Sequence, residues 1–211
     1  MSLVIAPQQN FTFKATDKRT ISDEYHKSFN VDVFVNKNMI DFYSSYPSFA
    51  SNGDQYTRWQ SYANTALDKP VADKLYPQIT ELVKGMTPQK AVNSILQWIQ
   101  YGIPYAYDDE VWGGDRVFFA EETLFYPGSD CEDRAILFTR IVRDVLHLPC
   151  VLVYYPGHLA AAIHFSEEVR GDRFELAGTD YVVCDPTYIG APVGMSMPGM
   201  DTDNARLIIL E

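Results

Sequence analysis

The strongest structural signal in the sequence is an amphipathic helix pattern that follows the turn at Pro127-Gly128 and stops at Leu148-Pro149. Apolar residues recur in this segment at spacings of three and four, as one face of a helix requires. Ser129 stands three residues before Glu132, which is the spacing of a capping box, so we expect Ser129 to cap the helix. The apolar stripe consists of Ile136, Leu137, Phe138, Ile141, Val142, Val145 and Leu146.

Cys131 falls in the first turn of this predicted helix. Backbone N–H groups lack helical partners there, and the helix dipole favours a thiolate. Asp130, Glu132 and Asp133 oppose a thiolate, each by about 0.3–1 kcal/mol at an exposed site. A close imidazolium lowers a cysteine pKa by several units, which is a larger effect. A nucleophilic Cys131 therefore requires a partner histidine, and the alternative is a buried packing role.

Two histidines are candidates for that partner. His158 follows the apolar run 151–155 and a Pro-Gly turn, and it opens a second apolar run that is typical of a strand. His164 lies an even number of residues further on, so side-chain alternation places both histidines on one face of a regular strand. A strand end beside a glycine turn is open to substrate, which favours His158 and leaves His164 a structural role.

Asp185 follows the apolar run 181–184, and Pro186 cannot donate to a sheet ladder, so a strand is expected to end there. A carboxylate at that position can accept the second ring N–H of a histidine and stabilise the imidazolium. A simple turn at Asp-Pro is the alternative. The chain order Cys131, His158, Asp185 is thus a candidate triad.

Three segments together carry a family resemblance: Gly128 to Phe138, Pro156 to His158, and Cys184 to Thr187. They resemble the transglutaminase-like superfamily of cysteine enzymes, most closely the bacterial transglutaminase-like predicted cysteine proteases, over about residues 85 to 195. The resemblance implies an α+β, papain-like fold in which the cysteine helix packs on an antiparallel sheet. It also implies that Cys131 is the nucleophile, His158 the general base and acid, and Asp185 the orienting carboxylate.

The function implied by this resemblance is hydrolysis of peptide or isopeptide amide bonds in a peptide or protein substrate, through a thioester acyl-enzyme. Transglutaminase-type transfer of the acyl group to an amine is an alternative. A noncatalytic transglutaminase-like binding module is another, because residues 159–162 are Leu-Ala-Ala-Ala where the family often has an aromatic residue soon after the histidine.

Two further features of the candidate site stay open in the sequence. Turn-like residues between His158 and Asp185 predict an extra strand at about Arg173 to Leu176, and a shifted pairing would make His164 the partner instead. An oxyanion also needs a second donor besides the Cys131 backbone N–H. The candidates are Trp98, Gln97, Gln100 and Trp112, with core packing favoured for Trp98 and a loop position beside the cleft for Trp112.

The rest of the chain reads as scaffold. Helical spacing predicts one helix over 69–84 that ends at Gly85. It also predicts a second that is capped by Thr87, starts at Pro88 and carries its apolar stripe up to Ile99, before Gly102. Alternation over residues 29–35 predicts a half-buried strand, and residues 44–64 show little periodicity. We expect one globular unit in which an N-terminal extension, 1–68, packs on a catalytic core, 69–211.

Composition excludes several classes of partner and cofactor. The net charge of −11 argues against nucleic acids and anionic membranes, and no apolar stretch is long enough to span a bilayer. The histidines and the three cysteines lack zinc-ligand spacing, so no metal or cofactor is expected. Cys150 and Cys184 are expected to be buried, with a bridge between them left open. Oligomeric state and compartment stay open. Residues 1–10 lack a signal-peptide core, and the cell envelope or secretion is expected if a native export signal has been removed from the N-terminus.

Overall fold

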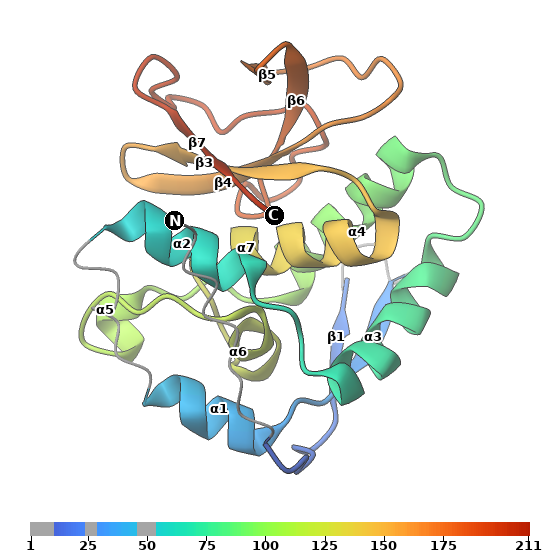
Figure 1. The fold of residues 1–211 in the computed structure, drawn as a ribbon, viewed down its shortest axis with the longest axis vertical. Helices are drawn as coiled ribbons and strands as arrows, with labels where there is room; N and C mark the ends of the chain where they lie inside the picture. The colour runs from blue at the N-terminus through green and yellow to red at the C-terminus, as the bar shows by residue number, and fades with distance from the viewer. Residues whose placement is uncertain (1–10, 24–28, 46–53) are drawn as a thin grey trace.

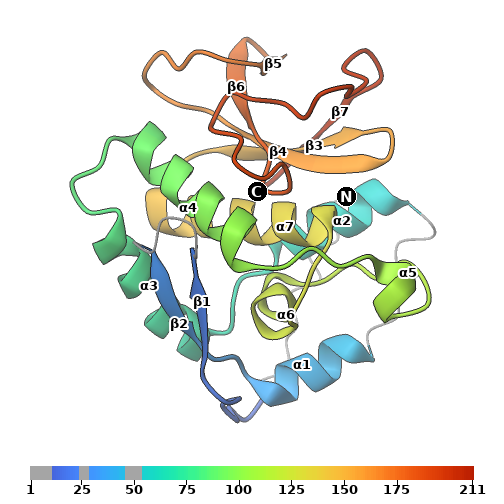
Figure 2. The same ribbon diagram turned by 180° about the vertical axis from the view of Figure 1, so that it is seen from behind.

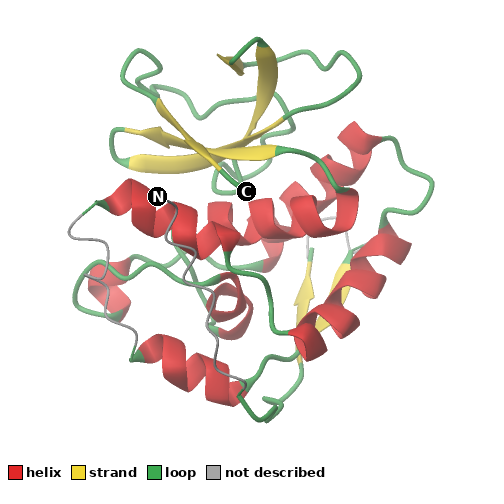
Figure 3. Cartoon of the chain, in the orientation of Figure 1, coloured by secondary structure: helices red, strands yellow, loops and turns green. Residues whose placement is uncertain are grey.

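The computed structural model describes residues 11–23, 29–45 and 54–211. It has the expected α+β composition, with one curled antiparallel sheet lying across a layer of helices (Figures 1 and 3). In chain order the elements are β1 (Arg19–Ser22), β2 (Asn30–Val33), α1 (Lys37–Ser44), α2 (Gln55–Asn64), α3 (Lys69–Leu82), α4 (Pro88–Gly102), α5 (Asp108–Val111), α6 (Ala120–Phe125), α7 (Cys131–Ile141), the π-helical turn η1 (Val142–Leu146), β3 (Cys150–Tyr155), β4 (His158–Ile163), β5 (Arg173–Leu176), β6 (Thr179–Cys184) and β7 (Arg206–Ile209).

The main sheet has the strand order β5-β6-β4-β3-β7, and every neighbouring pair is antiparallel. The tight turn at residues 156–157 joins β3 to β4, and Gly157 has a φ of 85°, which glycine adopts without the steric cost of a Cβ. Strands β3 and β4 are buried on both faces, which explains their continuous apolar sequences. A separate two-stranded sheet, β1 with β2, lies beside α3 and α4 (Figure 2).

Helix α7 is the central element of the fold. All of its residues are buried, because α7 packs against β4 on one side and against α2 and α6 on others. The last turn of the predicted helix is the π-helical turn η1, whose Asp144 pairs with the buried Arg140 of α7. Most buried apolar side chains, from Ile21 to Ile208, form one core that the N-terminal elements share with the rest of the chain. A smaller cluster, which includes Val153 and Tyr155, lies on the other face of β3 and β4.

Several boundaries agree with the sequence-based predictions. Helix α4 begins at Pro88 behind Thr87, whose side chain accepts from the backbone N–H of Lys90, and β5 covers Arg173–Leu176. Helix α3 ends just before Gly85, whose φ is 76°. Residues 44–64 had little periodicity, yet α2 forms there, while 46–53 lie outside the described residues. No helix among the described residues is long and apolar enough to cross a membrane.

Candidate active site

Cys131 is the first residue of α7, as predicted, but the residue that caps the helix is Asp130 and not Ser129. The Asp130 side chain accepts from the backbone N–H of Asp133 at 3.4 Å, and the Asp133 carboxylate accepts from the Asp130 N–H at 3.4 Å. This reciprocal pair is a capping box shifted by one residue. The backbone of Ser129 instead bonds to the segment 104–106, through its N–H to Pro104 and its carbonyl to Ala106, each at 3.1 Å.

His158 and Asp185 lie next to each other. The Nε2 atom of His158 is 2.8 Å from Oδ2 of Asp185, and both side chains are buried. β4 begins at His158 and β6 ends one residue before Asp185, so the sheet sets the position of both groups. The other carboxylate oxygen, Oδ1, accepts from the backbone N–H groups of Thr187 and Tyr188, which orients the carboxylate.

His164 lies away from this pair, just beyond the other end of β4. Its Nδ1 atom is 3.1 Å from the carbonyl oxygen of Asp180, and its ring packs against Tyr181. The extra strand β5 pairs with the outer edge of β6, so it leaves the pairing between β4 and β6 intact. Of the two candidate histidines, His158 is therefore the one that pairs with Asp185.

The sulfur of Cys131 contacts the strand that carries His158. The backbone N–H of Leu159 donates to this sulfur and favours the thiolate. Leu159 is opposite Tyr154 in β3, and the ladder between β4 and β6 starts only at Ala161. The N–H of His164 bonds to the Pro149 carbonyl at 2.9 Å. In an antiparallel ladder every second residue of a strand bonds to a given neighbour, so His164, Ala162, Ala160 and His158 bond to β3. The N–H of Leu159 therefore points away from β3. A thiol from α7 therefore occupies a place where the sheet offers an unpaired donor.

The charges around Cys131 favour a protonated thiol. Its pKa is raised well above the usual value by burial first, and then by the carboxylates of Glu132 and Asp130. The S–H group donates to Oε2 of Glu132 at 3.1 Å. Burial and repulsion from Glu132 also raise the pKa of Asp130 to about 9, and burial with Glu132 and Asp115 raises that of Asp108 to about 6. The first helical turn therefore disfavours the thiolate more strongly than the helix dipole favours it.

Two overlapping sets of ligand atoms at this acidic cluster lie close enough together to hold a metal ion. One comprises Asp108, Asp115 and Glu132, and the other comprises Asp130, Cys131 and Glu132, with atoms within 4.8 Å of one another in each set. The first offers only oxygen ligands, which suit a hard cation such as Ca²⁺ or Mg²⁺. The expectation of a metal-free site stays a prediction.

The thermal stability of the protein is expected to fall as the pH rises. The folded-state pKa values of Asp108 (about 6) and Asp130 (about 9) lie above the ordinary value of 3.8. Between pH 3.8 and these folded-state values, the folded protein therefore binds more protons than the unfolded protein. Stability from these groups is thus fully present below about pH 4 and is lost as the pH rises through their folded pKa values. We expect the melting temperature to decrease by roughly 5 °C between mildly acidic and mildly alkaline pH.

The check is a series of thermal unfolding curves for the wild type and Asp108→Asn. Because the substitution removes the group that titrates near pH 6, the variant should show a flatter dependence in the acidic part of the range. Identical curves for the two proteins would contradict the assignment.

Replacing Glu132 with glutamine is expected to make Cys131 more reactive. The substitution removes the carboxylate that accepts the S–H group, and lowering the thiol pKa by one unit raises the thiolate fraction about tenfold. We expect iodoacetamide to alkylate the variant about tenfold faster at neutral pH. The matched control is Glu81→Gln, which removes the same charge from an exposed ion pair on α3 and should leave the rate unchanged. Equal rates in all three proteins would show that Glu132 does not hold the thiol proton.

The side chains considered as second oxyanion donors have other roles. Trp98 is fully buried and its Nε1–H donates to the Ile21 carbonyl at 3.0 Å. It is therefore a core residue, which is the role that the sequence pattern favoured. Gln100 donates to the carbonyl oxygens of Asp185 and Ala191 and accepts from the Gly190 N–H. It therefore holds the loop that begins at Asp185 and is a positioning residue. Gln97 lies half-buried on α4.

Trp112 stands at the end of α5, where it packs edge-on against Phe118 and Tyr126. The Arg116 guanidinium lies 4.1 Å from the centre of its ring. Trp112 is thus the exposed member of an aromatic cluster that also contains the buried Phe118.

Tyr105 is the residue near the thiol that sequence reasoning missed. It pairs with Ser129 as an isolated parallel bridge, so the segment 104–106 runs beside the turn that precedes Cys131. Its pKa is raised by burial and then by its proximity to Cys131 and Asp130, which keeps the phenol protonated. The Arg134 guanidinium, itself buried, lies 5.2 Å from the ring centre and donates to the Ile103 carbonyl.

Gly128 permits this approach, since a Cβ there would come within 2.7 Å of the Ala106 Cβ. A glycine after a proline predicts a turn equally well without any partner segment, so the contact with residues 104–106 has no distinctive signal in the sequence.

Comparisons with protein-family models, with curated proteins and with solved structures find no match to the chain.

Proposed function

We propose that the protein is a thiol hydrolase that cleaves peptide or isopeptide amide bonds with Cys131 as nucleophile, His158 as base and acid, and Asp185 as orienting group. The observation that carries the proposal is the 2.8 Å contact from His158 Nε2 to Asp185 together with the donation from Leu159, the next residue, to the Cys131 sulfur. Nucleophilic catalysis by a thiol requires an imidazole that is oriented by a carboxylate. Asp185 orients His158 in this way, and the residue next to His158 in β4 is the one that reaches the sulfur.

The proposed fold relationship is to the papain-like, transglutaminase-like enzymes. A cysteine at the start of a central helix, packed on an antiparallel sheet that carries the histidine at one strand end and the aspartate after the neighbouring strand, is what that relationship predicts. The arrangement of α7, β4 and β6 supports it.

In the proposed reaction, His158 Nδ1 takes the thiol proton because Nε2 is engaged by Asp185. The sulfur attacks the carbonyl carbon, and the C=O electron pair moves to oxygen. Collapse of this intermediate breaks the C–N bond, and His158 returns the proton to the leaving amine, which gives a thioester. Water then adds with His158 as base and releases the carboxylic acid and the thiol.

We propose that the developing oxyanion is met by the backbone N–H of Cys131 and by the hydroxyl of Tyr105. The N–H belongs to the first turn of α7, where no helix carbonyl is available to it. Tyr105 is 42% exposed, and its pKa is raised by burial and then by the charge of Cys131, so the phenol stays protonated and can donate. Donors held in place by the fold stabilise an oxyanion without reorganisation.

The test is incubation with peptide and ε-lysyl isopeptide substrates, with products and covalent adducts identified by mass spectrometry. We expect hydrolysed product and a thioester on Cys131 in the wild type, and neither in Cys131→Ala. A labelled primary amine is included as a competing acceptor. Amine-linked product in excess of hydrolysed product would reassign the protein to acyl transfer.

One observation favours a second candidate, a noncatalytic binding module of the same family. Burial and two neighbouring carboxylates raise the pKa of Cys131, which disfavours the nucleophilic form. If Cys131 reacts with iodoacetamide no faster than free cysteine, and His158→Ala leaves that rate unchanged, the binding module is the correct assignment.

A further inference from the structure

Strand β7 is the edge of the main sheet on the side opposite β5, and it pairs only with β3 among the described strands. The bond from the His164 N–H to the Pro149 carbonyl fixes which residues of β3 bond to β4, and the intervening residues, Leu152 and Tyr154, bond to β7. Their partners in β7 are Ile208 and Arg206, so these two residues bond across to β3. The backbone groups of Leu207 and Ile209 then point outward. The carbonyl of Ile209 points outward and is already engaged by Gln60 of α2, at 2.6 Å, which leaves the outward groups of Leu207 and the Ile209 N–H for a partner.

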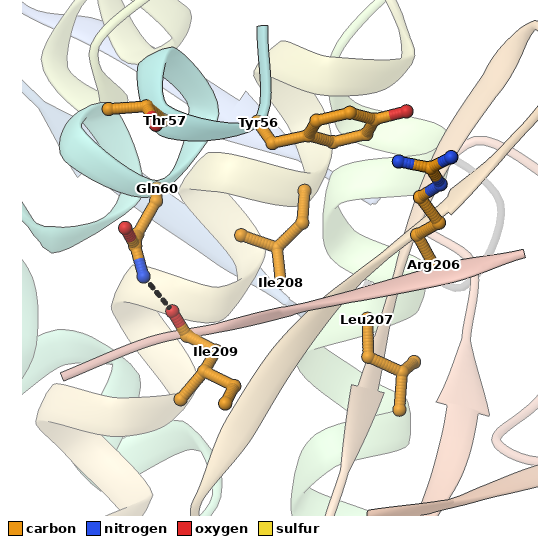
Figure 4. Close-up of a pocket in the computed structure, with 7 residues that line it drawn as sticks. All are labelled: Tyr56, Thr57, Gln60, Arg206, Leu207, Ile208 and Ile209. Atoms are coloured by element: carbon orange, nitrogen blue, oxygen red, sulfur yellow. Dashed lines mark hydrogen bonds between the residues drawn. The ribbon is translucent and has the colours of Figure 1, made fainter. Parts of the chain in front are cut away.

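A cavity of about 280 Å³ lies between this edge and α2 (Figure 4). Its lining residues are Tyr56, Thr57, Gln60, Arg206, Leu207, Ile208 and Ile209. A cavity over one face of a strand is lined by alternate residues, because successive side chains point to opposite faces. Here four consecutive residues of β7 form the wall, so the cavity follows the backbone edge of the strand.

The lining of this cavity is positively charged in an acidic protein. The chain has 28 acidic and 17 basic residues, yet the lining contains Arg206 and no carboxylate. The Arg206 guanidinium lies 5.3 Å from the centre of the Tyr56 ring, which holds it over α2, and none of the described residues forms an ion pair with it. Ile208 is the buried apolar floor beside it.

We propose that this groove binds an extended segment of a partner protein that adds as a strand to β7 and places a carboxylate on Arg206. Strand addition supplies main-chain hydrogen bonds, while side-chain pockets supply specificity. Arg206 and Ile208 point to the same face, so the segment carries one acidic and one apolar residue separated by a single residue. The proposal does not depend on the proposed hydrolase function, because β3 lies between β7 and the strand that carries His158.

The experiment measures binding of a fluorescein-labelled, capped octapeptide of threonine and valine that contains one isoleucine and one glutamate separated by a threonine. The protein is the Cys131→Ala variant of the 211-residue chain, so that the peptide is not cleaved. We expect the fluorescence anisotropy to rise to saturation as protein is added. The affinity should weaken about tenfold when glutamine replaces the peptide glutamate, and by the same factor in Arg206→Gln, because each change removes one charge-assisted contact. Arg206→Lys should recover part of the affinity.

Two readouts separate strand addition from a simple ion pair. N-methylation of the peptide amides that face β7 should abolish binding, whereas methylation of the alternate amides should not. Amide resonances of Leu207 and Ile209 should shift and gain exchange protection, while that of Leu159 stays unchanged. The proposal is overturned by absence of binding, by equal binding to wild type and Arg206→Gln, by insensitivity to methylation, or by a self-associated dimer that Arg206→Gln dissociates.

Discussion

His158→Ala is expected to lower kcat/KM for amide hydrolysis by about 10³-fold or more, because the variant loses the group that moves the proton in both half-reactions. The structure supplies a matched control in the same strand region. His164 interacts with the Asp180 carbonyl beyond the far end of β4, so His164→Ala should retain nearly full activity. The measurement is steady-state kinetics on the best peptide substrate, with far-ultraviolet circular dichroism to show that both variants are folded.

The His158→Ala result also has a stability component. Asp185 is buried and keeps its backbone donors from Thr187 and Tyr188, but it loses the imidazole at Oδ2. Leaving one side of a buried carboxylate unpaired costs about 1–3 kcal/mol. Activity within about tenfold of wild type in His158→Ala would remove His158 from the mechanism, and an equal loss in both histidine variants would point to a structural effect.

Tyr105→Phe is expected to lower kcat by about 10²-fold while leaving KM nearly unchanged, as is typical of removing one oxyanion donor. The substitution keeps the ring beneath Arg134 and deletes only the hydroxyl. The control is Tyr107→Phe, whose ring packs edge-on against Tyr105 at 5.0 Å and is 61% exposed. It should behave like wild type. Equal effects in the two variants, or a change confined to KM, would assign Tyr105 to substrate packing.

Local patterns predicted the elements that carry the candidate triad. The Pro-Gly turn before His158 and the proline after Asp185 are strong signals of strand boundaries. As they predict, β4 begins at His158 and β6 ends just before Asp185. The short strand β5 was predicted from turn residues on both sides of it. The π-helical turn at Val142–Leu146 was not, because its apolar spacing fits an ordinary helix equally well.

The features that the sequence could not predict depend on contacts between distant segments. Asp130 caps α7 in place of Ser129 because the Ser129 backbone is engaged by Pro104 and Ala106. Gln100 was a candidate oxyanion donor, but its amide is engaged by the loop after β6. Helix α2 has a weak apolar pattern and is stabilised by packing on α7 and β7, which is tertiary information.

The hydrogen bond from the Leu159 N–H to the Cys131 sulfur makes this amide a spectroscopic reporter of the chemical state of the sulfur. A backbone amide proton that bonds to sulfur is sensitive to whether that sulfur is a thiol, a thiolate or an acylated atom, since each differs as an acceptor. The ¹⁵N resonance of this single amide can therefore follow titration and acylation of Cys131 in the native protein. No substrate label or engineered probe is needed, because the ladder between β4 and β6 starts two residues too late to bind that proton itself.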